Sequence, residues 1–146
     1  MQEVVAVSAV RTAIGDFGGV LKDFPAPDLM ALVIREALTR ANCPDELISD
    51  VIIGQCMQRL DETVSARLAL LKAGLPQHIP GVTVHRNCAS AMQAMMQGAH
   101  EIMVGYADAV VVGGVEVMSR TPYSLYDARW GARLQHSRMS DGLWDG

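Results

Sequence analysis

The chain has 146 residues, of which 50% are hydrophobic and 19% are charged, and its formal net charge is −4. This composition excludes a disordered protein, because such chains combine low hydrophobicity with high net charge. The sequence has no basic stripe of the kind that binds nucleic acid, and no apolar run reaches the roughly 20 residues of a membrane-spanning helix. Its first residues have the pattern of neither a signal peptide nor a transit peptide. We therefore expect a cytoplasmic protein that forms one domain or part of one.

Strand and helix patterns alternate along most of the chain. Four short runs of β-branched and small residues predict buried strands, at residues 4–10, 51–54, 82–85 and 108–117. Residues 11–27 are rich in Gly, Asp and Pro and predict a loop. The strands are apolar throughout and do not alternate, which is typical of a parallel sheet buried on both faces.

Three helices are predicted between these strands. The first begins at Asp28, which can cap it, and ends at Asn42. Its apolar face is formed by Leu29, Leu32, Val33 and Ala37. The second has an apolar stripe formed by Val64, Leu68 and Leu71. The third spans roughly residues 88–104.

The order βαβαβαβ predicts an α/β fold with a mostly parallel sheet covered by helices on both faces. After Met118 the pattern changes, because residues 120–146 carry Tyr, Trp, Arg and Gly without periodicity. We therefore divide the chain into an α/β unit at residues 1–119 and the start of an irregular loop region at residues 120–146.

Residues 85–94, His-Arg-Asn-Cys-Ala-Ser-Ala-Met-Gln-Ala, carry the chemistry. Here a buried strand leads Cys88 into the first turn of the third helix, where unpaired N–H groups and the helix dipole stabilise a thiolate. The same N–H groups can hold the oxyanion that forms when a thioester carbonyl is attacked. The small side chains of Ala89, Ser90 and Ala91 let a substrate approach the backbone. This arrangement suits a cysteine that carries an acyl group between two nucleophiles.

From spacing alone, Cys88 also fits a buried core residue, because free cysteine is among the most buried residue types. A phosphatase loop is excluded, since the Arg that it needs six residues after the cysteine is Ala94 here. A hydrolase elbow needs Gly two residues to either side of the nucleophile, where Arg86 and Ser90 stand. The three cysteines, at positions 43, 56 and 88, form neither a disulfide framework nor the paired ligands of a zinc site, so we predict no metal.

Two stretches resemble the thiolase family, the acetyl-CoA acetyltransferases and 3-ketoacyl-CoA thiolases. They are Asn-Cys-Ala-Ser-Ala-Met-Gln-Ala at residues 87–94 and Val-Gly-Gly-Val-Glu-Val-Met-Ser at residues 112–119. Supporting segments follow the family's order at residues 11–15, 51–54, 66–67 and 73–76. The resemblance thus extends over most of the chain, which makes it far more specific than one motif.

The resemblance implies that Cys88 accepts an acyl group from an acyl-CoA or a 3-ketoacyl-CoA, with its backbone N–H forming half of an oxyanion hole. It also implies a fold of two similar halves, with residues 1–119 forming most of the first half. Residues 120–146 would begin a loop excursion that helps to bind CoA. Acyl-CoA and CoA are then substrates, no resident cofactor is needed, and the full-length protein is a homodimer or homotetramer. No nucleic acid or membrane partner is implied.

The sequence departs from the family in two ways. Thiolases commonly have Gly at the position of Ala91, whose methyl group could crowd a close contact. The family's activating histidine, in a Gly-His-Pro setting, and its acid/base cysteine, near Cys-x-Gly, have no counterpart here. Cys43 and Cys56 lie too early in the chain to replace that cysteine. We therefore expect a fragment that is inactive alone and is unstable or oligomeric.

The remaining polar candidates favour structural roles. His85 suits a packed or interface histidine better than a base, His78 a solvated turn, and His100 lies about 18 Å along the helix from Cys88. Glu116 and Arg67 are expected in structural pairs. A basic group after residue 119 is either solvated or attracts CoA phosphates; it comprises Arg120, Arg129, Arg133, His136 and Arg138. Four methionines are expected in a core, namely Met92, Met95, Met96 and Met103.

Two functions remain open at this point. The first is acyl transfer between CoA thioesters through Cys88, in 3-ketoacyl-CoA cleavage or acetoacetyl-CoA formation. The second is a non-catalytic, truncated thiolase-like module that binds CoA or a partner subunit. A ketoacyl synthase is disfavoured, because Asn-Cys-Ala-Ser with Gly-Gly-x-Glu-x-Met-Ser is the thiolase pattern. The acyl chain length is not predicted.

Overall fold

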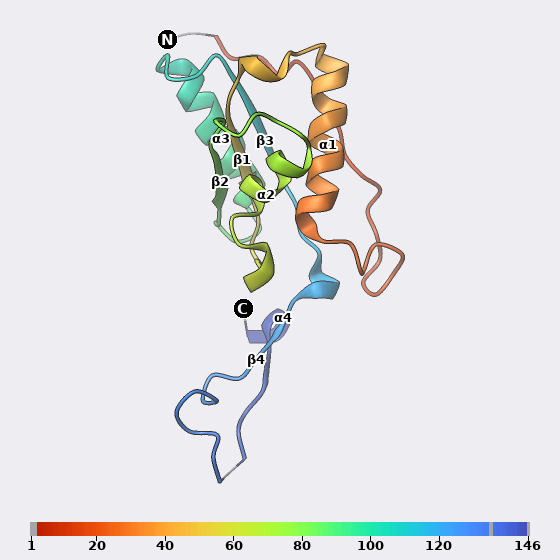
Figure 1. Ribbon diagram of the computed structural model, residues 1–146, viewed down its shortest axis with the longest axis vertical. Helices are drawn as coiled ribbons and strands as arrows, with labels where there is room; N and C mark the ends of the chain where they lie inside the picture. The colour runs from red at the N-terminus through yellow and green to blue at the C-terminus, as the bar shows by residue number, and fades with distance from the viewer. Residues whose placement is uncertain (1–2, 135, 146) are drawn as a thin grey trace.

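The computed structural model describes residues 3–134 and 136–145 of the chain. Its central sheet has three parallel strands in the order β2-β1-β3 (Figure 1). The strands are β1 (Ile48–Gly54), β2 (Gly81–Val84) and β3 (Ala109–Gly114). The central strand β1 is buried on both faces, which explains its uninterrupted apolar run Val51-Ile52-Ile53.

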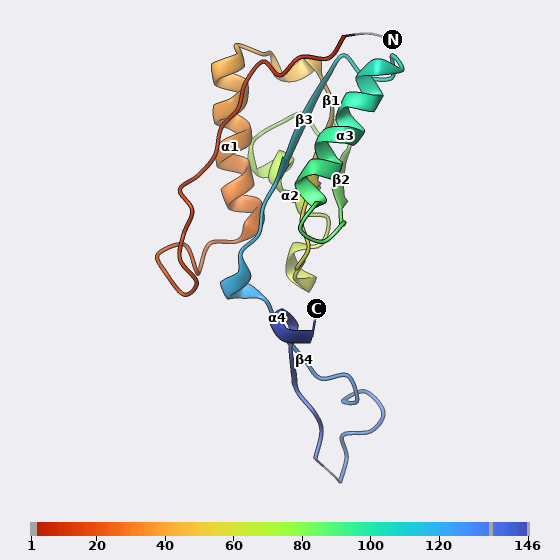
Figure 2. The same cartoon turned by 180° about the vertical axis from the view of Figure 1, so that it is seen from behind.

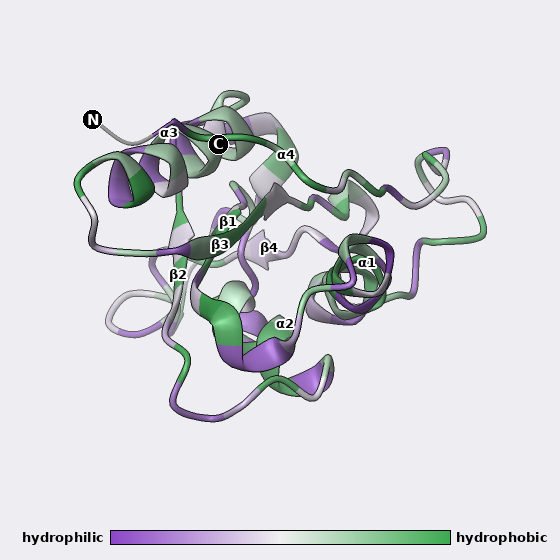
Figure 3. Cartoon of the chain, turned by 90° about the horizontal axis from the view of Figure 1, so that it is seen from above, coloured by the Kyte–Doolittle hydropathy of each residue, from purple (hydrophilic) through white to green (hydrophobic). Residues whose placement is uncertain are grey.

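Helices cover both faces of the sheet, as predicted. Helices α1 (Ala26–Ala41) and α2 (Ser65–Lys72) lie on one face and α3 (Ser90–Met103) lies on the other (Figure 3). Helix α1 ends as predicted at Asn42, which caps it in the left-handed conformation with φ 47°. Its start differs from the prediction, because Asp28 lies inside the first turn and pairs with Lys72 at 2.7 Å.

The buried faces of α1 and α2 differ from the predicted stripes. In α1 the predicted Leu29 is buried and Val33 packs against the core, but Met30, Ile34 and Leu38 are also buried and Leu32 is 62% exposed. In α2 the buried residues are Ser65, Ala66, Ala69 and Leu70, and both Val64 and Leu71 are exposed. Helix α2 packs against both α1 and the sheet, with Leu70 and the small residues Ser65, Ala66 and Ala69 facing its neighbours.

The predicted first strand at residues 4–10 is not a strand in this structure. The segment is extended and runs beside α1 (Figure 2), but it makes no ladder with β3, the nearer edge of the sheet. Val5 and Val7 are 66% and 74% exposed. A β-branched run needs a neighbouring strand to pair with, and no described strand lies against this segment.

The remaining elements are short. Single 3₁₀ turns lie at Asp45–Leu47, Leu60–Glu62 and Met118–Arg120. After residue 120 the chain forms a lobe that extends from the α/β body (Figure 1). The lobe contains a two-residue antiparallel pair, β4 (Tyr123–Ser124) with β5 (Ser140–Asp141), and the helical turn α4 (Gly142–Asp145). None of these was predicted. Among the described residues, no helix is long and apolar enough to span a membrane.

A buried ion pair holds the lobe's first turn to the body. The carboxylate of Glu62, 6% exposed, lies 2.6 Å from an Arg120 guanidinium nitrogen and also accepts a hydrogen bond from the Ala26 backbone N–H. Arg120 was predicted either to be solvated or to attract CoA phosphates. The structure gives it an internal partner instead.

Candidate active site

The carboxyl ends of the three parallel strands meet at one edge of the sheet. Gly54, at the end of β1, is in register with Val84 of β2 and with Gly114 of β3. Segments that follow parallel strands therefore converge here, at the edge where α/β proteins place their functional residues. Three such segments carry chemistry: residues 55–57 after β1, residues 85–89 after β2 and residues 115–117 after β3.

Cys88 is exposed in a tight turn that leads from β2 into α3. Asn87 before it has φ 47°, a left-handed conformation that asparagine tolerates better than most residues. The hydroxyl of the buried Ser90 closes the turn, because it donates to the Asn87 carbonyl at 2.6 Å and accepts from the Arg86 N–H at 2.8 Å. The turn thus presents the cysteine to solvent while its backbone is held from beneath.

Cys88 was predicted in the first turn of the third helix, but the structure places it two residues before that helix. Helix α3 begins at Ser90, and its N-cap is Ala89, whose side chain offers no capping hydrogen bond. The hydroxyl of Ser90 is engaged with the preceding turn. No side chain caps the start of α3, and the N–H groups of Ala89 and Ser90 donate to the carbonyls of Arg86 and Asn87 at 3.1 and 3.0 Å.

Two glycines let α3 approach the sheet closely at this edge. A Cβ atom on Gly54 would lie 2.3 Å from the Ser90 carbonyl carbon and 2.4 Å from the Ala91 nitrogen. A Cβ atom on Gly114 would lie 2.5 Å from the Cβ of Ala91. The methyl group by which Ala91 departs from the thiolase pattern thus faces Gly114. Gly114 therefore allows β3 to pack closely against α3, whereas Gly113 faces the α1 side near Met30.

Cys56 lies beside the Cys88 turn, although the sequence analysis set it aside because it comes early in the chain. Its Sγ donates to the Asn87 carbonyl at 2.9 Å and lies 3.5 Å from Oγ of Ser90. The sequence analysis considered Cys56 only as a replacement for the family's acid/base cysteine and did not predict that it lies close to the Cys88 turn. The signal was present, since Cys56 and Cys88 each follow a predicted parallel strand by two or three residues, and such positions share an edge.

Glu116 forms the structural pairing that was predicted, but with backbone groups and in an exposed position. Its carboxylate accepts the Cys56 N–H at 2.9 Å and the Met57 N–H at 3.2 Å. Arg67 is also structurally paired, since its guanidinium donates to the carbonyls of Ile79 and Gln77 at 2.6 and 2.8 Å.

Of the other candidates, His85 lies in the segment that follows β2, and His78, His100 and His136 lie outside the three segments. All four histidines are exposed, namely His78, His85, His100 and His136. Arg129 and Arg133 are exposed, and Arg138 pairs with Asp145. Within residues 3–134 and 136–145, no group of three His, Cys, Asp or Glu side chains is placed to hold a metal ion.

The predicted methionine core is wrong for the described residues. Met92, Met95 and Met96 are 65%, 59% and 44% exposed. Helix α3 faces the sheet with Ala94 and Gly98, which allow close packing on β3, while Met95 lines the apolar trench described next.

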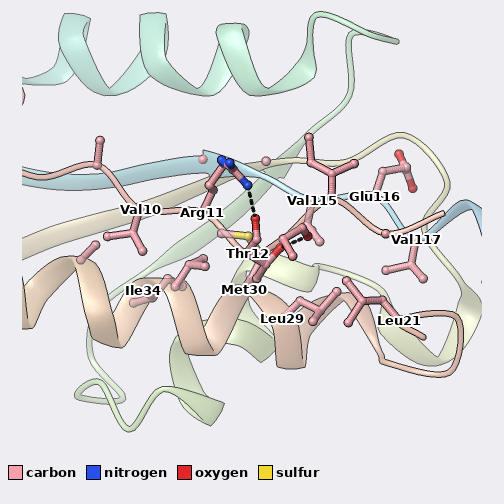
Figure 4. A pocket seen from close by; sticks show the side chains of 18 of the residues that line it. Val10, Arg11, Thr12, Leu21, Leu29, Met30, Ile34, Val115, Glu116 and Val117 are labelled. Carbon is pink, nitrogen blue, oxygen red and sulfur yellow. Dashed lines mark hydrogen bonds between the residues drawn. The ribbon is translucent and has the colours of Figure 1, made fainter. Parts of the chain in front are cut away.

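An apolar trench of about 630 Å³ lies on the other side of β3 (Figure 4). The extended N-terminal segment, α1 and β3 line it, with Val10, Met30, Ile34 and Val115 among the contributing side chains. Cys88 is not among its lining residues, so the trench is separate from the cysteine.

Comparison with known proteins gives one consistent result. Residues 4–146 match the family model described as the thiolase N-terminal domain. The chain is 45% identical to the acetyl-CoA acetyltransferase of Cupriavidus necator and 41% identical to that of Pseudomonas aeruginosa, each over 99% of this chain and 38% of the relative. The structure superposes on a crystal structure of the Bacillus anthracis acetyl-CoA acetyltransferase with a TM-score of 0.92 at 45% identity. That match covers 96% of this chain and 36% of the other. The chain thus spans 38% of the length of these two curated relatives.

Proposed function

The chain belongs to the thiolase family, whose N-terminal domain it matches, and we propose from this that Cys88 accepts the acyl group of a CoA thioester. The single observation that carries the proposal is the placement of Cys88: an exposed thiol on a left-handed turn at the uncapped start of α3. A buried spectator cysteine, the alternative that spacing left open, would need neither the exposure nor the turn.

The proposed step is a transthioesterification. The Cys88 thiolate attacks the thioester carbonyl, the new S–C bond forms, the bond to the CoA sulfur breaks, and CoA leaves as its thiolate. The acyl group then passes from Cys88 to a second nucleophile. The relatives from Cupriavidus and Pseudomonas are named acetyl-CoA acetyltransferases, which supports an acetyl group as the acyl unit.

The chain's own contribution to the barrier is positional and electrostatic. The start of α3 offers N–H donors to the oxyanion that develops on the thioester oxygen, and the backbone N–H of Cys88 is proposed to be one of them. The hydroxyl of Ser90 keeps the turn that carries Cys88 in its conformation. Both contributions come from backbone held against the sheet by Gly54 and Gly114.

We propose that further thiolase segments complete the reaction. The activating histidine and acid/base cysteine implied by the family have no counterpart in this sequence, and the curated relatives are longer than this chain. Acyl-CoA and CoA are the proposed substrates, without a resident cofactor, in 3-ketoacyl-CoA cleavage or acetoacetyl-CoA formation. A homodimer or homotetramer is the proposed assembly of the full-length protein. The chain alone is proposed to be inactive in turnover.

The test is intact mass spectrometry of the chain after incubation with acetyl-CoA and, separately, with iodoacetamide at neutral pH. We expect rapid alkylation that maps to Cys88 and is lost in Cys88→Ser but kept in Cys43→Ser, without stable acetylation. A single acetyl adduct on Cys88 would support the proposal more strongly, because the half-site would then activate its own nucleophile. Equal alkylation of Cys43 and Cys88 would refute the nucleophile and favour the non-catalytic module.

A further inference from the structure

A second thiol lies against the loop that carries the proposed nucleophile. The Sγ atom of Cys56 is 2.9 Å from the Asn87 carbonyl oxygen and 3.5 Å from Oγ of Ser90. Cys56 follows β1 and Cys88 follows β2, so two separate strands bring the thiols to the same edge of the sheet. Both cysteines are free, and both are at least partly accessible to solvent.

The separation of the two residues has an upper bound. The Asn87 carbonyl oxygen and the Cys88 Cα belong to one planar peptide unit. Adding the width of that unit to the contact at 2.9 Å places the Cys56 sulfur within about 6 Å of the Cys88 Cα. The Cα and Sγ atoms of a cysteine are about 3 Å apart, so the two Cα atoms lie within about 9 Å of each other. Disulfides join residues whose Cα atoms lie roughly 4.4–6.8 Å apart, so the exposed turn that carries Cys88 must move towards Cys56 by up to a few ångströms for the two sulfurs to bond.

The two residues differ in what holds them. The Cys56 backbone N–H is fixed by the Glu116 carboxylate, which also binds the next N–H. Cys88 is at the exposed tip of its turn. Oxidants in solution therefore reach Cys88 directly. The backbone of Cys56 is held by Glu116, so its sulfur stays in contact with the turn that carries Cys88.

We propose that Cys56 is the resolving partner of Cys88 and that the two form a reversible disulfide when Cys88 is oxidised by a peroxide. This inference rests on the proposed function, because it takes Cys88 to be the reactive thiolate. The thiolate attacks one peroxide oxygen to give a sulfenic acid and hydroxide. The Cys56 thiol then attacks the sulfenic sulfur, the S–S bond forms and water leaves. In sum, two thiols and one hydrogen peroxide give one disulfide and two waters.

The disulfide has two consequences for the site. It removes the thiolate that would take the acyl group, so acyl transfer stops until a thiol reductant restores both cysteines. It also competes with further oxidation of Cys88 to the sulfinic acid, which is not reversed by thiols.

The third cysteine provides an internal control. Cys43 follows α1 and precedes β1, so it lies at the opposite end of that seven-residue strand from Cys56, about 20 Å away. It is a partly buried free thiol. Any oxidation that joins cysteines without regard to position would involve Cys43 as well.

The test uses the 146-residue chain carrying Cys43→Ser, because trypsin leaves Cys43 and Cys56 in one peptide, residues 41–59. The chain is treated with one equivalent of hydrogen peroxide, blocked with iodoacetamide and measured by intact mass without reduction. We expect a monomer lighter by two hydrogens, and a tryptic species that joins residues 41–59 to residues 87–120. Dithiothreitol should restore both free thiols.

Cys56→Ser is the matched variant, since its hydroxyl can keep the hydrogen bond to Asn87. In Cys43→Ser/Cys56→Ser, dimedone should trap about tenfold more Cys88 sulfenic acid than in Cys43→Ser, because nothing resolves it. Circular dichroism of both chains checks the fold. Equal dimedone labelling, over-oxidation of Cys88 without the linked peptide, or disulfides only between two chains would each overturn the proposal.

Alkylation of the unoxidised chain separates this inference from the proposed function. Selective alkylation of Cys88 without the linked peptide overturns the disulfide and leaves the nucleophile standing. The linked peptide without selective alkylation supports the pairing of the two thiols and contradicts Cys88 as the proposed nucleophile.

Discussion

The Glu116 carboxylate accepts a hydrogen bond from the backbone N–H of Cys56 at 2.9 Å, joining the segments that follow β3 and β1. The next N–H, of Met57, binds the same carboxylate. We predict that Glu116→Ala lowers the free energy of unfolding by about 1 kcal/mol, because two N–H groups lose a charged acceptor at an exposed site. Glu116→Gln keeps an acceptor oxygen and should lose less. Urea unfolding measures both changes.

The control for this prediction is Glu36→Ala. Glu36 is exposed and pairs with Arg40 one helical turn away, so its loss should change stability by less than about 0.5 kcal/mol. If the two alanine variants are equally stable, the hydrogen bonds between Glu116 and residues 56–57 contribute nothing measurable to stability.

Gly54→Ala should displace the helix that carries the Cys88 turn. The added Cβ would meet backbone atoms of Ser90 and Ala91 at 2.3 and 2.4 Å, and backbone cannot move aside as a flexible side chain can. We predict a loss of about 2–3 kcal/mol, as for other overpacked sites, together with slower alkylation of Cys88.

Gly113→Ala is the matched control on the neighbouring strand. Its Cβ would meet only the end of the Met30 side chain at 3.3 Å and Ile53 at 3.7 Å. It should therefore be tolerated with little change in urea midpoint or alkylation rate. A Gly54→Ala chain that matches Gly113→Ala in both measurements contradicts the close approach of α3.

The strands and helices that make up the sheet and its covers were largely predictable from the sequence, because their apolar runs are long and local. The third helix, predicted at residues 88–104, begins at Ser90. The strand at residues 4–10 was not correctly predicted, because a strand also needs a partner and a run of residues does not show whether one is present. The faces of α1 and α2 were misassigned for a related reason. Periodicity predicts an apolar stripe, but only the packing decides which side small alanines must occupy.

The candidate site was predicted in part. Cys88 and its place between a strand and a helix follow from local pattern and from the resemblance, and the structure places the cysteine two residues before that helix. The contacts of Cys56 and Glu116 depend on strand order and register, which join residues 31 and 60 positions apart in the chain. Strand order is a tertiary property, so sequence spacing did not predict the contact between Cys56 and the Cys88 turn.

The folded chain should become more stable when Val64 is replaced by a residue that adopts the backbone conformation of this position more readily. It is a β-branched residue with φ 52° and ψ 56° at the start of α2, where it provides no side-chain cap. We predict that Val64→Asn stabilises the chain by about 1 kcal/mol, because asparagine tolerates the left-handed region and can cap the helix. Val64 is 47% exposed, so little burial is lost.

Urea unfolding also measures this change, with Val20→Asn as the control. Val20 is 91% exposed in a loop and does not itself have a positive φ. The Val20→Asn substitution should therefore not raise the free energy of unfolding. A Val64→Asn chain that is less stable than the parent would show that the Val64 side chain contributes more than its backbone conformation costs.

Asp50 should make stability depend on pH. Burial raises the pKa of this carboxyl, partly offset by the hydrogen bond that it accepts from the Val51 N–H. The folded chain therefore holds the proton more tightly than the unfolded chain, and stability falls as pH rises from the ordinary aspartate pKa through the raised one. Asp50→Asn keeps an acceptor oxygen without the charge, so it should be more stable than the parent above that window.

The measurement is the urea midpoint of both chains from acidic to neutral pH. The advantage of Asp50→Asn should disappear as the pH falls below the window, where the parent carboxyl is protonated in both states. Asp16→Asn, at an exposed position, is the control and should show no such trend. An advantage that stays constant across pH would mean that packing, not charge, sets the effect of Asp50.

The outer face of α3 should drive self-association of the chain. Met92, Met95 and Met96 are 65%, 59% and 44% exposed, and Met95 also lines the trench beside β3. Contiguous exposed apolar surface on a soluble chain favours burial against another surface, and flexible methionines adapt to many partners. We predict that the parent chain forms oligomers at micromolar concentration and that Met92→Lys/Met95→Glu shifts it towards monomer. Sedimentation velocity over a concentration series measures the shift.

Leu32→Lys is the control, since Leu32 is 62% exposed on α1 and not on this face, so it should leave the oligomer unchanged. If the double variant sediments like the parent, association uses another surface, and the unpaired edge of β3 is the next to be changed, because unpaired strand edges also associate.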